Sequence, residues 1–371
     1  MRIPLTCISK KHIMKHKTVD DIMEVLAWSF QQLAAQKTPS CRHDGQPWNQ
    51  SDSALRKKQV TDIQLTSVLA ELRGDWKMLK DSLRFPGWNE VGGICWRCMC
   101  TREGMKDPSA TATWRSERCS HWQLVERILA KGDSTSPIFS SPCFRTTCIK
   151  VDWLHCVDLG VAADFLGSLL YTVIKKMPGR SEDAKVREMF SEMQDYYRER
   201  AGDSRLDSLT KLMLKQPKKA PKLRGRAGEV RGLVDFGVLA AHKHLDASNP
   251  NENAAMQASL RLQGMYRNLS GAVFDPESLR ANCRQFCLLY SALAEKLPDM
   301  WRLKPKMHLL QELCEMQEQP SNPSLYWTYR DEDFGGSIAH VSRKRGGKNS
   351  PISTALSVLD RFIALTVVPS L

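Results

Sequence analysis

The sequence predicts a predominantly helical α+β protein, and two observations lead to that class. Apolar residues recur at helical spacing through most of the chain, whereas only residues 3–8 and 65–72 form the short apolar runs that are typical of strands. The 371 residues are 42% hydrophobic and 26% charged, which is the composition of a soluble globular protein with a core of ordinary size. This length suits about two or three domains, and the sequence contains no internal repeat.

The charge balance favours a polyanionic partner. The chain carries 54 Lys and Arg against 41 Asp and Glu, a net charge of +13. Nucleic acid is the first choice of partner and a membrane surface the second, with a merely solvated basic surface as the alternative. No run of about 18 apolar residues would span a membrane, and the N-terminus lacks a signal-peptide pattern. We therefore expect an intracellular protein without a membrane partner, whose twelve cysteines are reduced.

The N-terminal part combines one long helix with a short apolar run. Residues 18–35 have the periodicity of an amphipathic helix, for which Thr18 is the expected N-cap. A polar loop with Pro and Gly follows over residues 36–59. Residues 65–72 then form either a buried strand that ends near Asp75 or the first turns of a helix, and periodicity does not separate these two alternatives.

The rest of the chain is predicted to be mostly helical. Asp152 and His155 form an Asp-x-x-His pair that leads into an apolar helix over residues 161–174. Residues 211–231 are basic and contain two prolines and two glycines, which predicts a loop or a broken helix. The remaining helical patterns cover residues 114–131, 181–200, 234–244, 254–269, 276–297, 301–315 and 353–367.

Two cysteines have the spacing of metal ligands. Cys95 and Cys98 form a Cys-x-x-Cys pair after a Gly-Gly turn, which suits half of a tetrahedral zinc site. We expect His155 as the third ligand. The candidates for the fourth ligand are, in order, His121, Cys119 and Asp152. The alternatives are simple buried thiols and a redox dithiol, of which the second is less favoured because no βαβ pattern surrounds the pair.

Asp75 and Glu332 are the carboxylates that we single out for chemistry. Phosphoryl transfer by two metal ions needs carboxylates from distant parts of the chain to meet at one point. Taken alone, each residue is explained equally well as a surface acid or a helix cap, and residues 331–333 suit the acidic first turn of a helix.

Basic residues in three places are candidate contacts to nucleic-acid phosphates. Contacts of this kind give salt-sensitive, sequence-independent binding, and a solvated basic loop is the alternative explanation. His308 is treated either as a further phosphate contact or as a structural residue. The candidate phosphate contacts are Lys215, Lys218, Lys219, Lys222, Arg224, Arg226, Lys304, Lys306, Arg343, Lys344 and Arg345.

Taken in order along the chain, these motifs resemble a known family. An apolar run leads to Asp75 in LAELRGD, the Cys-x-x-Cys pair follows, and DWLHCVDLGV carries the Asp-x-x-His pair. A Lys-Pro-Lys-x-His segment then precedes the late acidic helix. This order is similar to that of the ribonuclease H-like DDE/D transposases of eukaryotic DNA transposons, with the CACTA and KDZ types nearest in character. Nearly the whole chain also resembles multicopy transposase-like proteins of dinoflagellate genomes.

The resemblance implies an incomplete ribonuclease H-like core that is interrupted by a large, zinc-bearing helical insertion. Asp75 would match the second catalytic acid and Glu332 the third, with Asp331 or Asp333 as a substitute for Glu332. The implied segments are a partial core, a Cys-rich insertion, a helical insertion and a return to the core, over residues 1–90, 91–150, 151–300 and 301–371.

The family reaction is Mg²⁺-dependent cleavage and transfer of DNA strands, in which carboxylates hold the metal. The first acid of the family would lie before Met1, since Asp44 is too close to Asp75 to leave room for the intervening strands. We therefore expect a truncated, inactive copy that still binds DNA. The resemblance also implies a nuclear location and is compatible with an oligomer. The alternative function is a zinc-stabilised helical interaction module without a nucleic-acid role.

Overall fold

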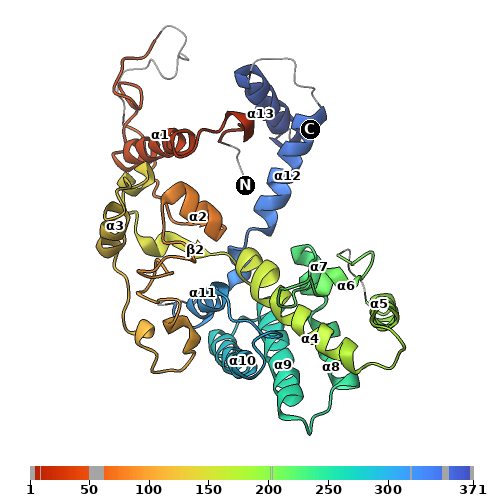
Figure 1. Cartoon of the computed structure of the whole chain (residues 1–371). Helices are drawn as coiled ribbons and strands as arrows, with labels where there is room; N and C mark the ends of the chain where they lie inside the picture. Colours follow the sequence, from red (N-terminus) through yellow and green to blue (C-terminus); the bar gives the residue numbers. More distant parts are fainter. Residues whose placement is uncertain are drawn as a thin grey trace.

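The computed structural model describes residues 5–8, 10–49, 62–200, 202, 204–317, 320–344 and 351–367, and these are mostly helical (Figure 1). Within these ranges there are two strands of three residues each, so the predicted helical class is confirmed. Two strands of this length do not by themselves show a ribonuclease H-like sheet. Of the strand expected at residues 3–8, residues 3 and 4 lie outside the described ranges, and residues 5–8 form no strand.

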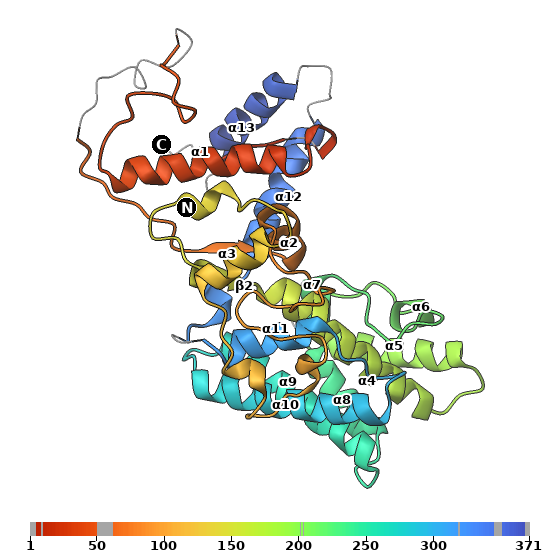
Figure 2. The ribbon, with the colours of Figure 1, turned by 60° about the vertical axis from the view of Figure 1, so that its left-hand side comes forward.

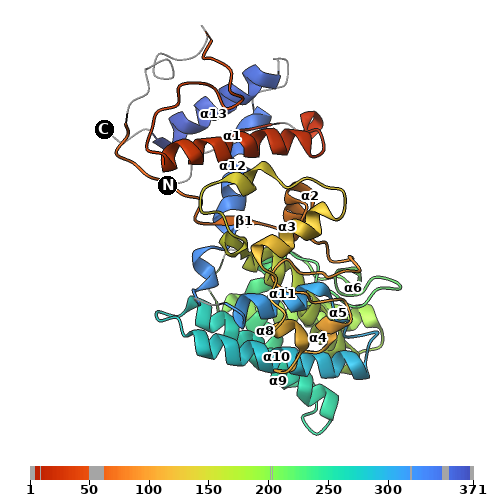
Figure 3. The same ribbon diagram turned by 90° about the vertical axis from the view of Figure 1, so that its left-hand side faces the viewer.

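Helix α1 (Lys17–Ala34) is the amphipathic helix that the periodicity predicts. The expected N-cap was wrong: Thr18 lies inside the helix, and its Oγ1 accepts a hydrogen bond from Met14 N at 2.9 Å. Helix α1 packs against η4 (Pro137–Ser140) of the Cys-rich segment. Figures 2 and 3 show α1 and α13 (Pro351–Val367) at the same end of the molecule.

The two strands form a small parallel sheet. β1 (Leu72–Gly74) pairs with β2 (Ile149–Val151) in a register that aligns their last residues. Because parallel strands end at the same edge of a sheet, the residues that follow them, Asp75 and Asp152, leave the sheet side by side. This edge is where the candidate site lies.

Asp75 also begins the helix that follows β1. Its Oδ1 accepts a hydrogen bond from Met78 N at 2.5 Å and so caps α2 (Trp76–Leu83). Residues 65–71 form neither the strand nor the helix that the sequence left as alternatives. Only Leu72 of that run belongs to β1, and α2 begins beyond the run, directly after Asp75.

The Cys-rich segment between the strands has little regular structure and is held by buried aromatic rings. Its one longer helix, α3 (His121–Leu129), starts with a capping box between Ser120 and Gln123. Trp96 and Trp114 are each 1% exposed and anchor the segment in the core. The other helical turns are η2 (Gly104–Lys106), η3 (Thr113–Arg115), η4 and η5 (Thr146–Cys148).

The long apolar helix after β2 is the centre of the helical body. It starts as a π-helix, η6 (Leu154–Ala162), and continues as α4 (Ala163–Lys176). The span Leu154–Lys176 is long and apolar enough to cross a membrane, but 89% of its most apolar window is buried inside the protein, as in the core helix of a soluble protein. The helices that pack around it and against one another are α5 (Glu182–Arg198), α6 (Lys211–Leu214), α7 (Ala227–Gly232), α8 (Val234–His244), α9 (Pro250–Ser270), α10 (Pro276–Lys296) and α11 (Pro305–Cys314).

The chain returns to the sheet edge after α11. The turn η7 (Pro323–Leu325) leads to α12 (Tyr329–Lys344), which carries Glu332 in its first turn and runs away from the helical body (Figure 1). Helix α13 packs against α12.

Candidate functional site

A cleft of about 350 Å³ opens where β1 and β2 end. Its wall is formed by the start of α2, by η6 and by the start of α11, which are far apart in the sequence. The ionisable side chains that line it are Asp75, Lys77, Asp152, His155, Cys156, Asp164, Lys222, Lys304 and Lys306. The cleft thus collects several of the residues that the sequence marked for chemistry.

His155 joins two carboxylates from distant parts of the chain. Its Nδ1 lies 2.6 Å from Asp152 Oδ2, and its Nε2 lies 3.0 Å from Glu332 Oε1. Partial burial lowers the pKa of His155, but the hydrogen bond to Asp152 and the negative charges of Asp152, Glu332 and Asp75 outweigh burial and raise the pKa above its usual value. Because Asp152 and Glu332 both accept, the protonated ring donates from both nitrogens and connects η6 with α12.

Asp152 is buried, and its carboxylate is fully engaged by the protein. Besides the ring of His155, it accepts hydrogen bonds from His155 N at 2.9 Å, from Thr328 N at 2.9 Å and from Thr328 Oγ1 at 2.8 Å. Burial raises the pKa of Asp152, but these hydrogen bonds outweigh it and lower the pKa. Because Thr328 directly precedes α12, Asp152 positions the helix that carries Glu332.

The raised pKa of His155 predicts a pH-dependent stability. Its favourable charge interactions are fully present below the unfolded pKa of about 6.5 and are lost as the pH rises through the higher folded pKa. The free energy of unfolding should therefore fall on going from pH 6 to above the folded pKa, and this fall should be smaller in His155→Gln. Urea unfolding of both proteins across this range measures the difference, and identical slopes would contradict the prediction.

Among the described residues, the predicted catalytic carboxylates Asp75 and Glu332 each have one oxygen without a hydrogen-bond donor. In the described part of the chain, Asp75 uses Oδ1 for the cap of α2, and Glu332 uses Oε1 for His155. The charge of Asp75 contributes to the raised pKa of His155, which places Asp75 near the pair of His155 and Glu332. One oxygen of each carboxylate is therefore left for a ligand.

Three predicted phosphate contacts lie in the same cleft. Lys304 Nζ donates to Asp164 Oδ1 at 2.6 Å, and Lys306 Nζ donates to the backbone oxygen of His155. Lys222 is half-buried, and burial lowers its pKa although Asp164 acts in the opposite direction. The cleft thus combines ammonium groups with carboxylates.

The other predicted phosphate contacts of the basic segment lie between α6 and α7. Lys218, Lys219 and Arg226 are exposed. Lys215 and Arg224 turn inward and donate to backbone carbonyl oxygens of the segment itself. Of the exposed residues, Arg226 is paired with Glu229, since its Nε lies 3.0 Å from Glu229 Oε1, so Lys218 and Lys219 are the better placed to reach a partner.

The basic residues near the C-terminus are only partly described. Arg343 is exposed on α12, where its Nε donates to Ala339 O at 3.3 Å. The side chain of Lys344 and the whole of Arg345 lie outside what the structure describes.

The Cys-x-x-Cys pair meets two residues of α11. The ligand atoms of Cys95, Cys98, His308 and Glu312 all lie within 4.8 Å of one another, and all four side chains are buried. Cys98 Sγ lies 3.2 Å from His308 Nε2, which in turn lies 3.6 Å from Glu312 Oε1. Trp114 packs edge-on against the His308 ring at 4.6 Å and fixes its orientation. Two thiols, an imidazole and a carboxylate in this arrangement could hold a metal ion.

Neighbouring groups support this cluster as they do at metal sites. The backbone N–H of Arg97 donates to Cys95 Sγ at 3.3 Å, and Arg118 binds both oxygens of Glu312 at 2.8 Å. Burial raises the pKa of Glu312, but Arg118 outweighs it and holds the pKa below its usual value. Burial raises the pKa of the Cys95 thiol well above its usual value, so a metal would have to displace the proton.

The expected partners of the cysteine pair were wrong. None of His155, His121, Cys119 and Asp152 belongs to a possible metal group among the described residues. His121 begins α3 and its ring packs against Phe139, with 5.7 Å between ring centroids.

Sequence reasoning missed His308 and Glu312 as ligands because it treated His308 only as a phosphate contact or a structural residue. The signal that could have found them is their spacing of four residues on a helix, which puts both side chains on one face.

Comparisons with known proteins do not identify a family. No protein-family model and no curated protein matches this sequence.

Proposed function

We propose that this chain is a nucleic-acid-binding protein of ribonuclease H-like transposase ancestry. It binds the phosphodiester backbone in the cleft where β1 and β2 end. The observation that carries the proposal is that Lys222, Lys304 and Lys306 line the same cleft as Asp75 and His155, although these residues come from distant parts of the chain.

The chemistry of the cleft suits a phosphodiester. The ammonium groups attract phosphate oxygens without regard to base sequence. The free oxygens of Asp75 and Glu332 suit a hard divalent cation such as Mg²⁺, which commonly bridges protein carboxylates and phosphates. The ancestry is supported by the order of the parts: a strand that ends at Asp75, a parallel strand that leads into Asp-x-x-His, a long helical stretch, and the return at α12.

We assign the group of Cys95, Cys98, His308 and Glu312 to a structural Zn²⁺ ion. Thiolates and imidazole favour zinc over the hard cations, and four protein ligands leave no open position for catalysis. The ion would hold the Cys-rich segment against α11. Lys304 and Lys306, at the start of this helix, line the cleft.

The protein is expected not to cleave DNA. Asp152 provides the carboxylate next to Asp75 at the sheet edge. Both of its oxygens accept hydrogen bonds from Thr328 and His155, so it is not available to bind a metal. A supercoiled plasmid incubated with the protein and Mg²⁺ should therefore stay intact. Nicking that is abolished by Asp75→Ala would show instead that the site is a working nuclease.

DNA binding should depend on the exposed lysines between α6 and α7. The double variant Lys218→Glu and Lys219→Glu is expected to bind a generic duplex several-fold more weakly at low salt. The slope of log affinity against log salt concentration should also become less steep, by the amount expected for the loss of about two phosphate contacts. Fluorescence anisotropy over a salt series measures both quantities.

A matched variant controls for the change of net charge. Lys296→Glu with Arg302→Glu alters the same number of charges at exposed positions outside the cleft and the basic segment. It should leave the affinity much closer to that of the wild type. If the unmodified protein does not bind DNA even at low salt, the proposal fails, and the metal-clasped helical interaction module remains.

A further inference from the structure

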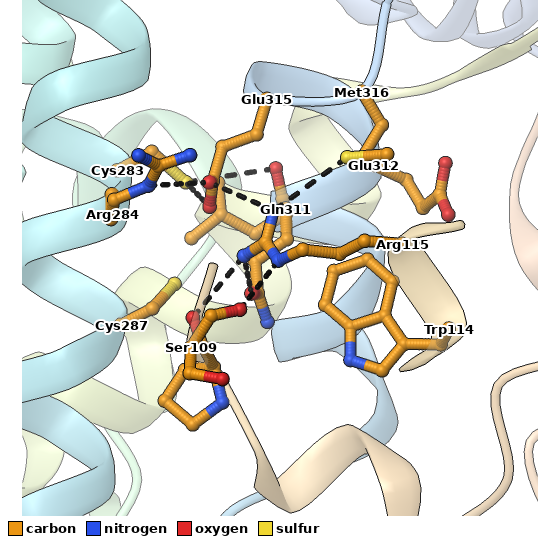
Figure 4. A network of polar contacts seen from close by, with 12 residues as sticks. Ser109, Trp114, Arg115, Cys283, Arg284, Cys287, Gln311, Glu312, Glu315 and Met316 are labelled. Carbon is orange, nitrogen blue, oxygen red and sulfur yellow. Dashed lines mark hydrogen bonds and ion pairs between the residues drawn. The ribbon is translucent and has the colours of Figure 1, made fainter. Parts of the chain in front are cut away.

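A second group of possible metal ligands lies in the core between α10 and α11. Cys283 and Cys287 stand one turn apart on α10, and Glu315 caps the end of α11. Their ligand atoms all lie within 4.8 Å of one another, and all three residues are buried. Figure 4 shows the two thiols and the carboxylate of Glu315 facing one another across the helix interface.

We propose that Cys283, Cys287 and Glu315 form a second, buried site for a thiophilic divalent cation of the zinc type. The proposal does not depend on the nucleic-acid role, and it concerns residues other than those of the first cluster.

The spacing suits a tetrahedral ion. Zinc bonds of about 2.3 Å to sulfur and about 2.0 Å to oxygen put neighbouring ligand atoms roughly 3.5–3.8 Å apart. Cys283 Sγ lies 3.8 Å from Glu315 Oε1, close to this value before any ion draws the ligands together. Two sulfur atoms border the group: Cys287 Sγ lies 3.7 Å from Met307 Sδ, and the thiol of Cys314 is near enough to contribute to the raised pKa of Cys283, after burial.

The carboxylate of Glu315 is oriented for this role by two arginines. Arg115 and Arg284 both bind Oε2, at 3.0 and 3.2 Å, whereas Oε1 faces Cys283. Arg115 is itself anchored by Gln311 Oε1 at 2.9 Å and by the backbone oxygen of Ser109 at 2.7 Å (Figure 4). Carboxylates that bind metals are typically held in this way: neighbouring residues donate hydrogen bonds to one oxygen, and the other oxygen faces the metal.

Packing of small apolar side chains explains the thiols but not the carboxylate. The side chain of Glu315 is only 1% exposed, and a buried charge is costly unless it is paired. The two arginines satisfy Oε2. Oε1 accepts only a weak hydrogen bond from the thiol of Cys283 at 3.8 Å, and a cation shared with the two thiolates would replace this contact with a stronger one.

Metal analysis of the intact chain tests the proposal. Protein produced with supplemented zinc and then freed of loosely bound ions should contain two zinc ions per chain, as measured by mass spectrometry. The double variant Cys283→Ala and Cys287→Ala should contain one ion fewer. Cys98→Ser should also contain one zinc ion fewer, but the ion that it loses is that of the first cluster. Cys156→Ser is the matched control, because Cys156 is a buried helical thiol that belongs to neither group, and it should keep the wild-type content.

A second measurement needs no variant to fold. The wild-type protein is alkylated under native conditions with and without a strong chelator, and peptide mass spectrometry identifies the labelled thiols. Cys283 and Cys287 should become reactive only with the chelator, while Cys156 should stay equally protected in both. Zinc content that is unchanged in the double variant, or protection of Cys283 and Cys287 that the chelator does not alter, would overturn the second site. Failure of the first site would instead appear at Cys95 and Cys98.

Discussion

Cys98→Ser should lose the metal of the first cluster and melt at a markedly lower temperature than the wild type. Cys98 contacts His308 directly, and its thiolate would be one of four ligands that join the Cys-rich segment to α11. A structural zinc supplies about 10–16 kcal/mol of apparent binding free energy, which in such sites is folding free energy. Losing even about 3 kcal/mol of it should lower the melting temperature by roughly 4 °C in a chain of this size.

Two controls separate loss of the ion from loss of a sulfur atom. Cys143→Ser changes an exposed thiol outside both metal groups and should melt like the wild type. A strong chelator should lower the melting temperature of the wild type toward that of Cys98→Ser, and it should affect the variant far less. Equal zinc content and equal melting in Cys98→Ser and the wild type would show that no ion holds this cluster.

The helices of this protein are readable from the sequence because their signals are local. The apolar spacing of residues 18–35 predicts α1 almost to the residue, and the stripe in residues 276–297 predicts α10 equally well. Residues 65–72 were ambiguous because a short apolar run does not separate a strand from a helix, and in the structure only Leu72 of this run belongs to a strand. Only the pairing of β1 with β2, more than 70 positions away along the chain, fixes where that strand lies.

The candidate sites are only partly readable, because what joins them is tertiary. The sequence marked Cys95, Cys98 and His155 as ligands of one ion, but the fold keeps only the two cysteines together. His155 instead bridges Asp152 and Glu332, while α11 brings His308 to the cysteines. A motif shows which side chains are available for a site, whereas the packing of distant helices decides which of them meet.

The close contact between α4 and the basic segment shows how packing controls the cleft. A Cβ atom at Gly167 would lie 2.3 Å from Lys222 Cα and 2.3 Å from Leu223 N, so only glycine fits. The hydrogen bond from Leu223 N to Ala163 O, at 2.8 Å, holds the two segments together. Any larger residue must push the segment that carries Lys222 away from the cleft.

Gly167→Ala is therefore expected to destabilise the protein and to weaken DNA binding together. Overpacking against backbone atoms costs about 1–3 kcal/mol or more, whereas alanine gains about 1 kcal/mol over glycine inside a helix. Because the contacts at 2.3 Å are to backbone atoms, we expect the overpacking cost at the upper end of this range and a net loss of up to about 2 kcal/mol in urea unfolding. Gly335→Ala provides the opposite case, because a Cβ there meets nothing within 4 Å on α12 and should stabilise the helix slightly. If the two variants unfold alike, the contact at Gly167 does not hold the basic segment, and the position of Lys222 must be set by other contacts.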